Sequence, residues 1–227
     1  MQLFFGENII TMKRNTVVIL LFISLQACSQ KTETKQIMAT IDNNKELLSE
    51  KSSDTATFGS GCFWCTEAIF QQLKGVDTVL PGYSGGRRPN PTYEQVSSGA
   101  TGHAEVTQII FDPSVISFDD LLEVFWKSHD PTTLNRQGAD VGTQYRSVIF
   151  YHNARQKEIA EQYKKKLNEA HAFPSPVVTE ITQFQAFYPA EDYHVNYYNN
   201  NIHAPYCTFV IQPKVDKVRE VFRDKLK

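Results

Sequence analysis

The chain has 227 residues and a formal net charge of −2, with 41% hydrophobic and 12% aromatic residues. Such a balance, without a long run of like charges, lacks the basic face that nucleic-acid-binding proteins use. The apolar content is sufficient for one sizeable core, so we expect a single compact domain.

The first 28 residues have the pattern of an export signal. A basic segment begins at Met12, and a short apolar run follows over residues 16–25. This run is too short to span a bilayer comfortably. Cys28 then completes a Leu-Gln-Ala-Cys sequence that resembles a bacterial lipoprotein box, in which Gln26 is an unusual member.

These features lead to a prediction about export. Met12 is the expected start of translation, residues 1–28 are the expected signal peptide, and Cys28 is the expected lipid attachment site. We therefore predict a periplasmic or membrane-anchored lipoprotein in preference to a cytoplasmic protein. Residues 29–53 are polar and poor in aromatics, which predicts a flexible tether before a folded domain at residues 54–227.

The domain opens with a predicted strand at residues 56–60 and a predicted helix at 62–73. Cys62 is expected in the first turn of this helix, where unpaired N–H groups and the helix dipole favour a reactive thiolate. Cys65 stands three positions later, within reach for a disulfide. The pair indicates a redox-active nucleophile.

Two structural alternatives compete with that interpretation of Cys62 and Cys65. Both could be small half-buried hydrophobes, or both could be half of a zinc site. A zinc site would need two further ligands at close spacing, and the sequence contains no second C-x-x-C or H-x-x-x-H pair.

The rest of the domain alternates between strand and helix patterns. We predict helices at residues 91–96, 118–127 and 154–170, and strands at 76–83, 104–111, 146–151 and 177–182. This order predicts an α+β sandwich, with helices packed against a mixed, mostly antiparallel sheet.

Several polar residues in these elements would be unremarkable if they were considered singly. Glu105 would be a solvated charge at the start of a strand, and Asp140 an ordinary turn residue. Tyr93 and Tyr145 would be packing residues whose hydroxyls find some partner. These four residues suggest a function only when they are considered together with the cysteine motif.

Considered together, these residues belong to a series of ordered motifs. The series is Gly61-Cys62-Phe63-Trp64, Gly82-Tyr83-Ser84-Gly85-Gly86, Pro89-Asn90-Pro91-Thr92-Tyr93, Gly102-His103-Ala104-Glu105, His129-Asp130-Pro131 and Asp140-Val141-Gly142-Thr143-Gln144-Tyr145-Arg146-Ser147. It resembles the type A peptide-methionine (S)-S-oxide reductases, also called type A methionine sulfoxide reductases. The similarity continues through Tyr188-Pro189-Ala190-Glu191-Asp192-Tyr193-His194 to Pro205-Tyr206-Cys207, so it covers nearly the whole predicted domain.

The resemblance implies a ferredoxin-like fold and a repair reaction on oxidised methionine, free or in proteins. Cys62 would attack the sulfoxide sulfur, and Glu105 would donate a proton to the sulfoxide oxygen. A sulfoxide is a poor electrophile until its oxygen is protonated, and a desolvated glutamate keeps its proton at higher pH. Loss of the thioether would leave Cys62 as a sulfenic acid.

The resemblance also implies supporting roles around these two residues. Phe63 and Trp64 would hold the S-methyl group of the substrate. Tyr93 and Tyr145 would hydrogen-bond to the sulfoxide oxygen, and Asp140 would organise the site. The family chemistry implies no bound cofactor or metal, and an external thioredoxin-like dithiol as reductant.

Recycling of the sulfenic acid requires another thiol. Many relatives have Gly where this chain has Cys65, and carry resolving cysteines in a glycine-rich tail. Here Cys207 is followed by a strand-like run, residues 208–211, without glycine. We therefore predict that Cys65 resolves first, because a C-x-x-C pair needs little movement. Three alternatives remain open, namely Cys207 as the first resolving thiol, a relay from the Cys62–Cys65 pair to Cys207, and an inert Cys207.

Three histidines belong to the matched motifs. His103 and His194 are expected to hydrogen-bond behind the site, and His129 to cap the C-terminus of a helix; a metal role has no ligand spacing to support it. The rival functions are a thioredoxin-type thiol-disulfide oxidoreductase and an anchored binding lipoprotein with a structural cysteine pair. A monomer is the default assembly.

Overall fold

The computed structural model describes residues 53–227. The predicted signal peptide, the lipidation site Cys28 and residues 29–52 of the predicted tether lie outside this range. Within residues 53–227, no helix has the length and hydropathy of a bilayer-spanning segment.

A six-stranded sheet forms the centre of the described domain. Its strands are β1 (Asp54–Ser60), β2 (Val76–Ser84), β3 (Ala104–Phe111), β6 (Ser147–Tyr151), β7 (Glu180–Gln183) and β8 (Phe187–Pro189). They lie in the order β7-β6-β1-β3-β2-β8. The β6–β7 pair is parallel and the other four pairs are antiparallel. The prediction of a mixed, mostly antiparallel sheet is confirmed.

Two helical crossovers join the four central strands. Helix α2 (Phe63–Phe70) connects β1 to β2, and α4 (Phe118–Ser128) connects β3 to β6. The resulting β-α-β-β-α-β unit with spatial order β6-β1-β3-β2 is the ferredoxin-like arrangement. The predicted fold class is therefore correct.

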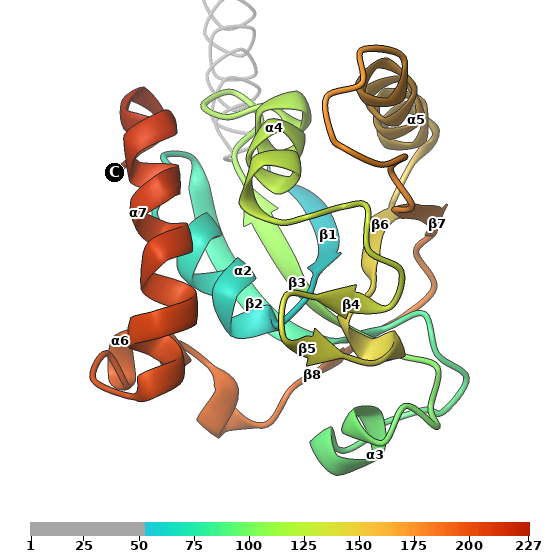
Figure 1. Cartoon of the computed structure of the whole chain (residues 1–227), viewed down its shortest axis with the longest axis vertical. Coiled ribbons are helices and arrows are strands. Elements are labelled where there is room, and N and C mark those ends of the chain that lie inside the picture. The colour runs from blue at the N-terminus through green and yellow to red at the C-terminus, as the bar shows by residue number, and fades with distance from the viewer. Residues whose placement is uncertain (1–52) are drawn as a thin grey trace, which may run out of the picture. The chain divides into compact units, whose positions relative to one another are not determined.

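The other elements surround this unit (Figure 1). They are α3 (Tyr93–Ser97), the hairpin of β4 (Arg136–Gln137) and β5 (Asp140–Val141), α5 (Ala154–Glu169), α6 (Tyr197–Asn200), a π-helical turn (Cys207–Ile211), α7 (Gln212–Val221) and three short 3₁₀ turns (Thr143–Tyr145, Asp192–His194 and Arg223–Lys225). Helix α7 packs against α2 and α4, whereas α3 lies apart from this helical layer.

Alternation along the strands separates two apolar clusters. In β3, Ile109 and Phe111 join the main core beneath the helices, where Phe58, Leu121 and Phe125 are also fully buried. Burial of each such side chain stabilises the fold by about 1.5–3 kcal/mol. The alternate residues of β3 form a smaller cluster with β6 on the other face of the sheet.

Element boundaries follow the predictions closely in the first half of the domain. Strand β3 has the predicted bounds, but the predicted helix at 62–73 begins at Phe63 and ends at Phe70. Gly75 has a φ of +78°, so the chain turns into β2 soon after the helix.

The predicted strand at 177–182 begins only at Glu180. The reason is local: the N–H of Val177 donates to the side chain of Asn168, and the N–H of Val178 donates to the carbonyl of Pro131. Both donors are therefore engaged outside the sheet.

Candidate active site

The link between β1 and α2 fixes the backbone of Cys62. Gly61 has a φ of +92°, and a Cβ at this position would lie 2.6 Å from the Cβ of Gln137 in β4. Glycine is therefore required for the turn and for the close approach of the β4–β5 hairpin. Cys62 follows as the N-cap of α2, one residue before the first helical turn in which it was predicted.

Glu105 reaches the same point from β3. It lies on the helix-covered face of the strand with Ile109 and Phe111, because alternate side chains of a strand share a face. Its Oε2 accepts a hydrogen bond of 3.1 Å from the N–H of Phe63, the residue directly after Cys62. The carboxyl group is 1% exposed, and burial raises its pKa to about 8 despite this hydrogen bond.

Cys62 and Glu105 both line a cavity of about 190 Å³. Residues from several helices, strands and turns line it. They are Cys62, Phe63, Trp64, Tyr93, Glu105, Asp140, Tyr145 and Tyr206. The structure thus brings together every residue predicted to act on the substrate. Burial, together with the charge of nearby Glu105, raises the pKa of both Tyr93 and Tyr145, so their hydroxyls stay protonated donors at neutral pH.

Phe63 and Trp64 form the aromatic wall of the cavity. The Trp64 ring stacks on Tyr197 of α6 with centroids 3.7 Å apart and planes 8° apart. Its Nε1–H donates a hydrogen bond of 3.1 Å to Nδ1 of His194. Phe63 packs against Tyr83 behind it. The wall is therefore apolar toward the cavity and fixed in orientation from outside.

Tyr206 is a lining residue that sequence reasoning missed as a functional side chain. Its hydroxyl donates a hydrogen bond of 2.7 Å to Oδ2 of Asp140 and also lies within hydrogen-bonding reach of the Cys62 thiol. Burial and the nearby thiols raise its pKa. The signal in the sequence was the position of Tyr206 in the matched Pro-Tyr-Cys segment.

The two thiols of the C-x-x-C pair contact each other. Cys62 is 6% exposed and Cys65 is 2% exposed, and their side chains share a hydrogen bond. Burial, reinforced by Cys65, raises the pKa of Cys62 well above its usual value. The hydrogen bond from Cys62 and the nearby Lys214 lower the pKa of Cys65 to about 7.

The predicted preference of Cys62 for the thiolate form is therefore wrong for the resting pair. At the N-cap its side chain makes no capping hydrogen bond, and the N–H of Phe63 is used by Glu105. Burial then dominates over the helix dipole. Within the pair, the first negative charge lies on Cys65.

Cys207 lies outside the cavity and is fully buried in the main core. The strand predicted from the run after it is wrong, because residues 207–211 form a π-helical turn that continues into α7. Burial, and to a lesser degree the charge of nearby Cys65, raises the pKa of Cys207. Cys62, Cys65 and Cys207 are all free cysteines in this structure.

The three histidines of the motifs have structural partners. His129 is the C-cap of α4, as predicted, and its Nδ1 hydrogen-bonds to the carbonyl of Phe125 at 2.7 Å. His194 supports Trp64, and His103 accepts a hydrogen bond of 3.0 Å from the N–H of Gly86. Among residues 53–227, no group of three or more His, Cys, Asp or Glu side chains is placed to hold a metal ion.

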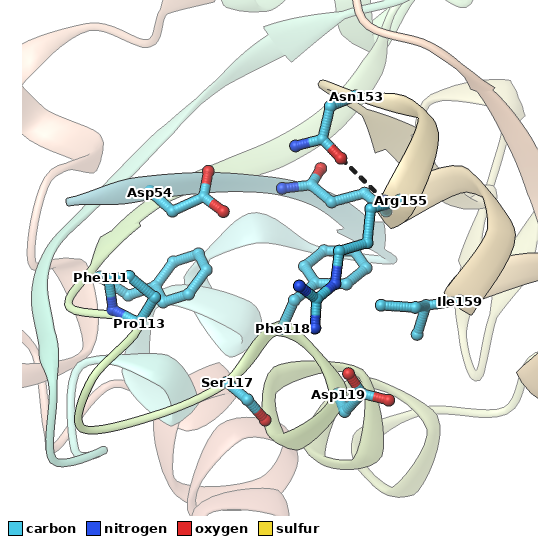
Figure 2. Close-up of a pocket in the computed structure, with 10 residues that line it drawn as sticks. Asp54, Phe111, Pro113, Ser117, Phe118, Asp119, Asn153, Arg155 and Ile159 are labelled. Carbon is cyan, nitrogen blue, oxygen red and sulfur yellow. Dashed lines mark hydrogen bonds between the residues drawn. The ribbon is translucent and has the colours of Figure 1, made fainter. Parts of the chain in front are cut away.

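A second cavity, of about 200 Å³, lies at the opposite end of β1. Figure 2 shows it between Asp54, the first turn of α4 near Asp119, and the first turn of α5, where Arg155 points into the space. None of the ten described residues that line it is a cysteine, a histidine or a tyrosine. This second cavity therefore offers no thiol, imidazole or phenol group for the chemistry proposed at Cys62.

Comparison with known proteins agrees with this site. The family model described as peptide methionine sulfoxide reductase matches residues 54–226. The chain belongs to the peptide methionine sulfoxide reductase family.

Named relatives of this reductase are similar over nearly their whole length. It is 55% identical over 174 residues to peptide methionine sulfoxide reductase MsrA of Saccharolobus solfataricus, a match that covers 77% of this chain and 97% of the relative. It is 57% identical over 176 residues to MsrA of Sulfolobus acidocaldarius, covering 76% and 97%. The reductase therefore acts on methionine sulfoxide.

A solved structure supports the same assignment. Methionine sulfoxide reductase A of Corynebacterium diphtheriae is 36% identical to the reductase, with a TM-score of 0.60 over 67% of this chain and 77% of that one.

Proposed function

We propose that the reductase reduces the S-epimer of methionine sulfoxide, free or in proteins, through a sulfenic acid on Cys62. The observation that carries this proposal is the meeting of a thiol and a buried carboxylic acid at one small cavity. Cys62 and Glu105 both line it, and the N–H of Phe63 joins the acid to the residue next to the nucleophile. The epimer follows from the resemblance to type A reductases.

The first half of the cycle transfers an oxygen atom. The sulfur of Cys62 attacks the sulfoxide sulfur and forms an S–S bond while Glu105 protonates the sulfoxide oxygen. The substrate S–O bond then breaks as the oxygen moves to the sulfur of Cys62, and the S–S bond breaks with its electron pair returning to the sulfur of methionine. The thiol proton leaves through the hydrogen bond to Cys65. The products are methionine and Cys62–SOH, so the substrate sulfur gains the two electrons that the cysteine sulfur loses.

The side chains around the cavity fit this transfer. The hydroxyls of Tyr93 and Tyr145 can donate to the oxygen as negative charge develops on it. Phe63 and Trp64 offer an apolar surface for the S-methyl group. Asp140 holds the hydroxyl of Tyr206 beside Cys62.

The second half of the cycle restores the thiol. We propose that Cys65 forms a disulfide with Cys62, and that a thioredoxin-like dithiol then reduces it. The hydrogen bond between the two thiols supports this order, because bridge closure needs little backbone movement. Cys207, buried within a helical turn, is assigned at most a later, secondary role.

Substitution of each candidate thiol separates these roles. In Cys65→Ser, one turnover should still release methionine, whereas repeated turnover with thioredoxin should fall sharply because the sulfenic acid cannot be resolved. In Cys207→Ser, most thioredoxin-dependent turnover should remain. Peptide mass spectrometry of the oxidised enzyme gives the direct measurement. A dominant Cys62–Cys207 bridge, with no Cys62–Cys65 species even at short times, would contradict this assignment.

We further propose that residues 1–28 direct export, that Cys28 carries a lipid and that residues 29–53 tether the catalytic domain of residues 54–227. The match of the family model to residues 54–226 supports the division between tether and domain. The basic segment, the apolar run and the cysteine support the rest. The protein would then be a monomeric, periplasmic or membrane-anchored lipoprotein, in preference to a cytoplasmic one.

The lipid anchor can be tested in a bacterial host. The full chain should incorporate a labelled fatty acid and sediment with membranes, and Cys28→Ala should lose both properties because the acceptor sulfur is gone. Cys65→Ser is the matched control, since it removes a thiol without touching the signal. An unlabelled wild-type chain whose intact mass retains residues 12–28 would contradict the proposal.

A further inference from the structure

Lys214 of α7 contacts the Cys65 thiol. Its Nζ lies 3.6 Å from Sγ of Cys65, across 149 residues of sequence. The contact results from the packing of α7 against α2. Lys214 is half-buried, and a lysine that leaves solvent normally does so beside a partner of opposite charge. A thiolate on Cys65 provides that partner.

Some of the groups around Cys65 stabilise its thiolate form and others destabilise it. Cys62 donates a hydrogen bond that stabilises a Cys65 thiolate, and the charge of Lys214 acts in the same sense. Asp140 opposes it. Glu105, Tyr206 and Cys207 also lie near this sulfur, and burial, with a smaller contribution from the charge of Cys65, raises their own pKa values. Lys214 therefore brings a positive charge that offsets the negative charge of Asp140.

We propose that Lys214 is a positioning residue for the second half of the cycle, in which it holds Cys65 as the thiolate that attacks oxidised Cys62 and later departs again. This inference rests on the proposed role of Cys65 as the resolving thiol. It adds a residue that neither thiol motif contains, supplied by a helix at the far end of the chain.

The bridge-closing step requires a thiolate. The electron pair of Cys65 forms a bond to the sulfur of Cys62–SOH, and the S–O bond breaks. Its oxygen leaves with the proton it carries, and one more proton converts it to water. The formal oxidation state of the Cys62 sulfur falls by one as that of the Cys65 sulfur rises by one, so no further reactant enters.

The reopening step uses the same ammonium group. A thiolate of the external dithiol attacks one sulfur of the bridge, and the more acidic thiol is the better leaving group. With Lys214 beside it, Cys65 leaves as the thiolate, so the mixed disulfide forms on Cys62. The second thiol of the reductant then displaces Cys62.

The test compares Lys214→Met with Lys214→Arg, which keeps the charge, and with Lys217→Met, which removes an exposed charge from the same helix. Each reduced protein is mixed with one equivalent of methionine sulfoxide in the presence of a sulfenic-acid probe. Quenched samples are then analysed for methionine, labelled Cys62 and the Cys62–Cys65 bridge over a range of pH.

In Lys214→Met, bridge closure at neutral pH should be about tenfold slower, and its pH profile should move upward by roughly one unit. Probe-labelled Cys62 should accumulate because a smaller fraction of Cys65 is in the thiolate form that attacks the sulfenic acid. Lys214→Arg and Lys217→Met should follow the wild type. Bridge closure in Lys214→Met at the wild-type rate and with the wild-type pH profile would overturn the inference.

A measurement on the wild type covers the case in which Lys214→Met does not fold. The ultraviolet absorbance of thiolates, wild type minus Cys65→Ser, should titrate with a midpoint of about 7. A midpoint at the ordinary value of about 8.5 would overturn the inference. Failure of the proposed function looks different: the wild type would release no methionine, or its bridge would form between Cys62 and Cys207.

Discussion

We expect the Cys62→Ser variant to release no methionine from methionine (S)-sulfoxide. A serine hydroxyl is a much weaker nucleophile than a cysteine sulfur, and its oxygen cannot take up the sulfoxide oxygen as the cysteine sulfur does when it becomes a sulfenic acid. The loss should appear in the first turnover, before any reductant is needed. Single-turnover assays that measure released methionine give the test.

Cys207→Ser is the control for this experiment, because it also removes a buried thiol but lies outside the cavity. Its first turnover should match the wild type. Retention of more than about a tenth of the wild-type rate in a folded Cys62→Ser variant would count decisively against the mechanism.

We expect Glu105→Gln to slow methionine release by roughly 10²–10⁴-fold while substrate binding changes little. The amide keeps the shape of the side chain and a hydrogen bond to the N–H of Phe63, but it cannot deliver a proton. Single-turnover rates at saturating and limiting substrate separate the rate of the step from binding.

The pH dependence of methionine release provides a second test of Glu105 as the proton donor. Its pKa is raised to about 8, so the carboxyl group is protonated below that pH and loses its proton above it. Methionine release by the wild type should therefore fall as pH rises through about 8. Glu105→Gln should lack this descending limb, since an amide does not titrate.

Glu67→Gln is the matched control for Glu105→Gln. Glu67 is also 1% exposed and its pKa is also raised by burial, to about 7. Its carboxylate accepts a hydrogen bond of 2.8 Å from the N–H of Asn196 and does not line the cavity. A loss in Glu67→Gln as large as that in Glu105→Gln would indicate that burial of any charge, and not proton donation, sets the rate.

Local patterns predicted much of the fold. Strand β3 was predicted without error because its apolar residues alternate and Asp112-Pro113 follows its last residue. The lining of the cavity was predicted through ordered motifs, which report residues that meet in space although they lie far apart in sequence. Neither local patterns nor ordered motifs show how burial and nearby charges act on a thiol. The thiolate was therefore predicted at Cys62, whereas the structure favours it at Cys65.

The segment after Cys207 shows why a local pattern can mislead. Thr208, Phe209 and Val210 favour a strand by propensity. The longer spacing of Cys207, Ile211, Val215, Val218 and Phe222, all buried in the main core, is that of one helix face. Packing of this face against α2 decides the conformation, and propensity does not. The contact between Lys214 and Cys65 depends on the same packing, so no window of the sequence contains it.

The hydrogen bond from Phe63 to Glu105 has a consequence for how the site tolerates motion. The donor N–H belongs to the peptide unit that begins at Cys62, and a peptide unit is planar and stiff. The carboxyl group of Glu105 is thus hydrogen-bonded to the peptide unit that carries Cys62, although Phe63 and Glu105 are 42 residues apart. We expect motion of the surrounding loops to change substrate entry more than it changes the distance between the acid and the nucleophile.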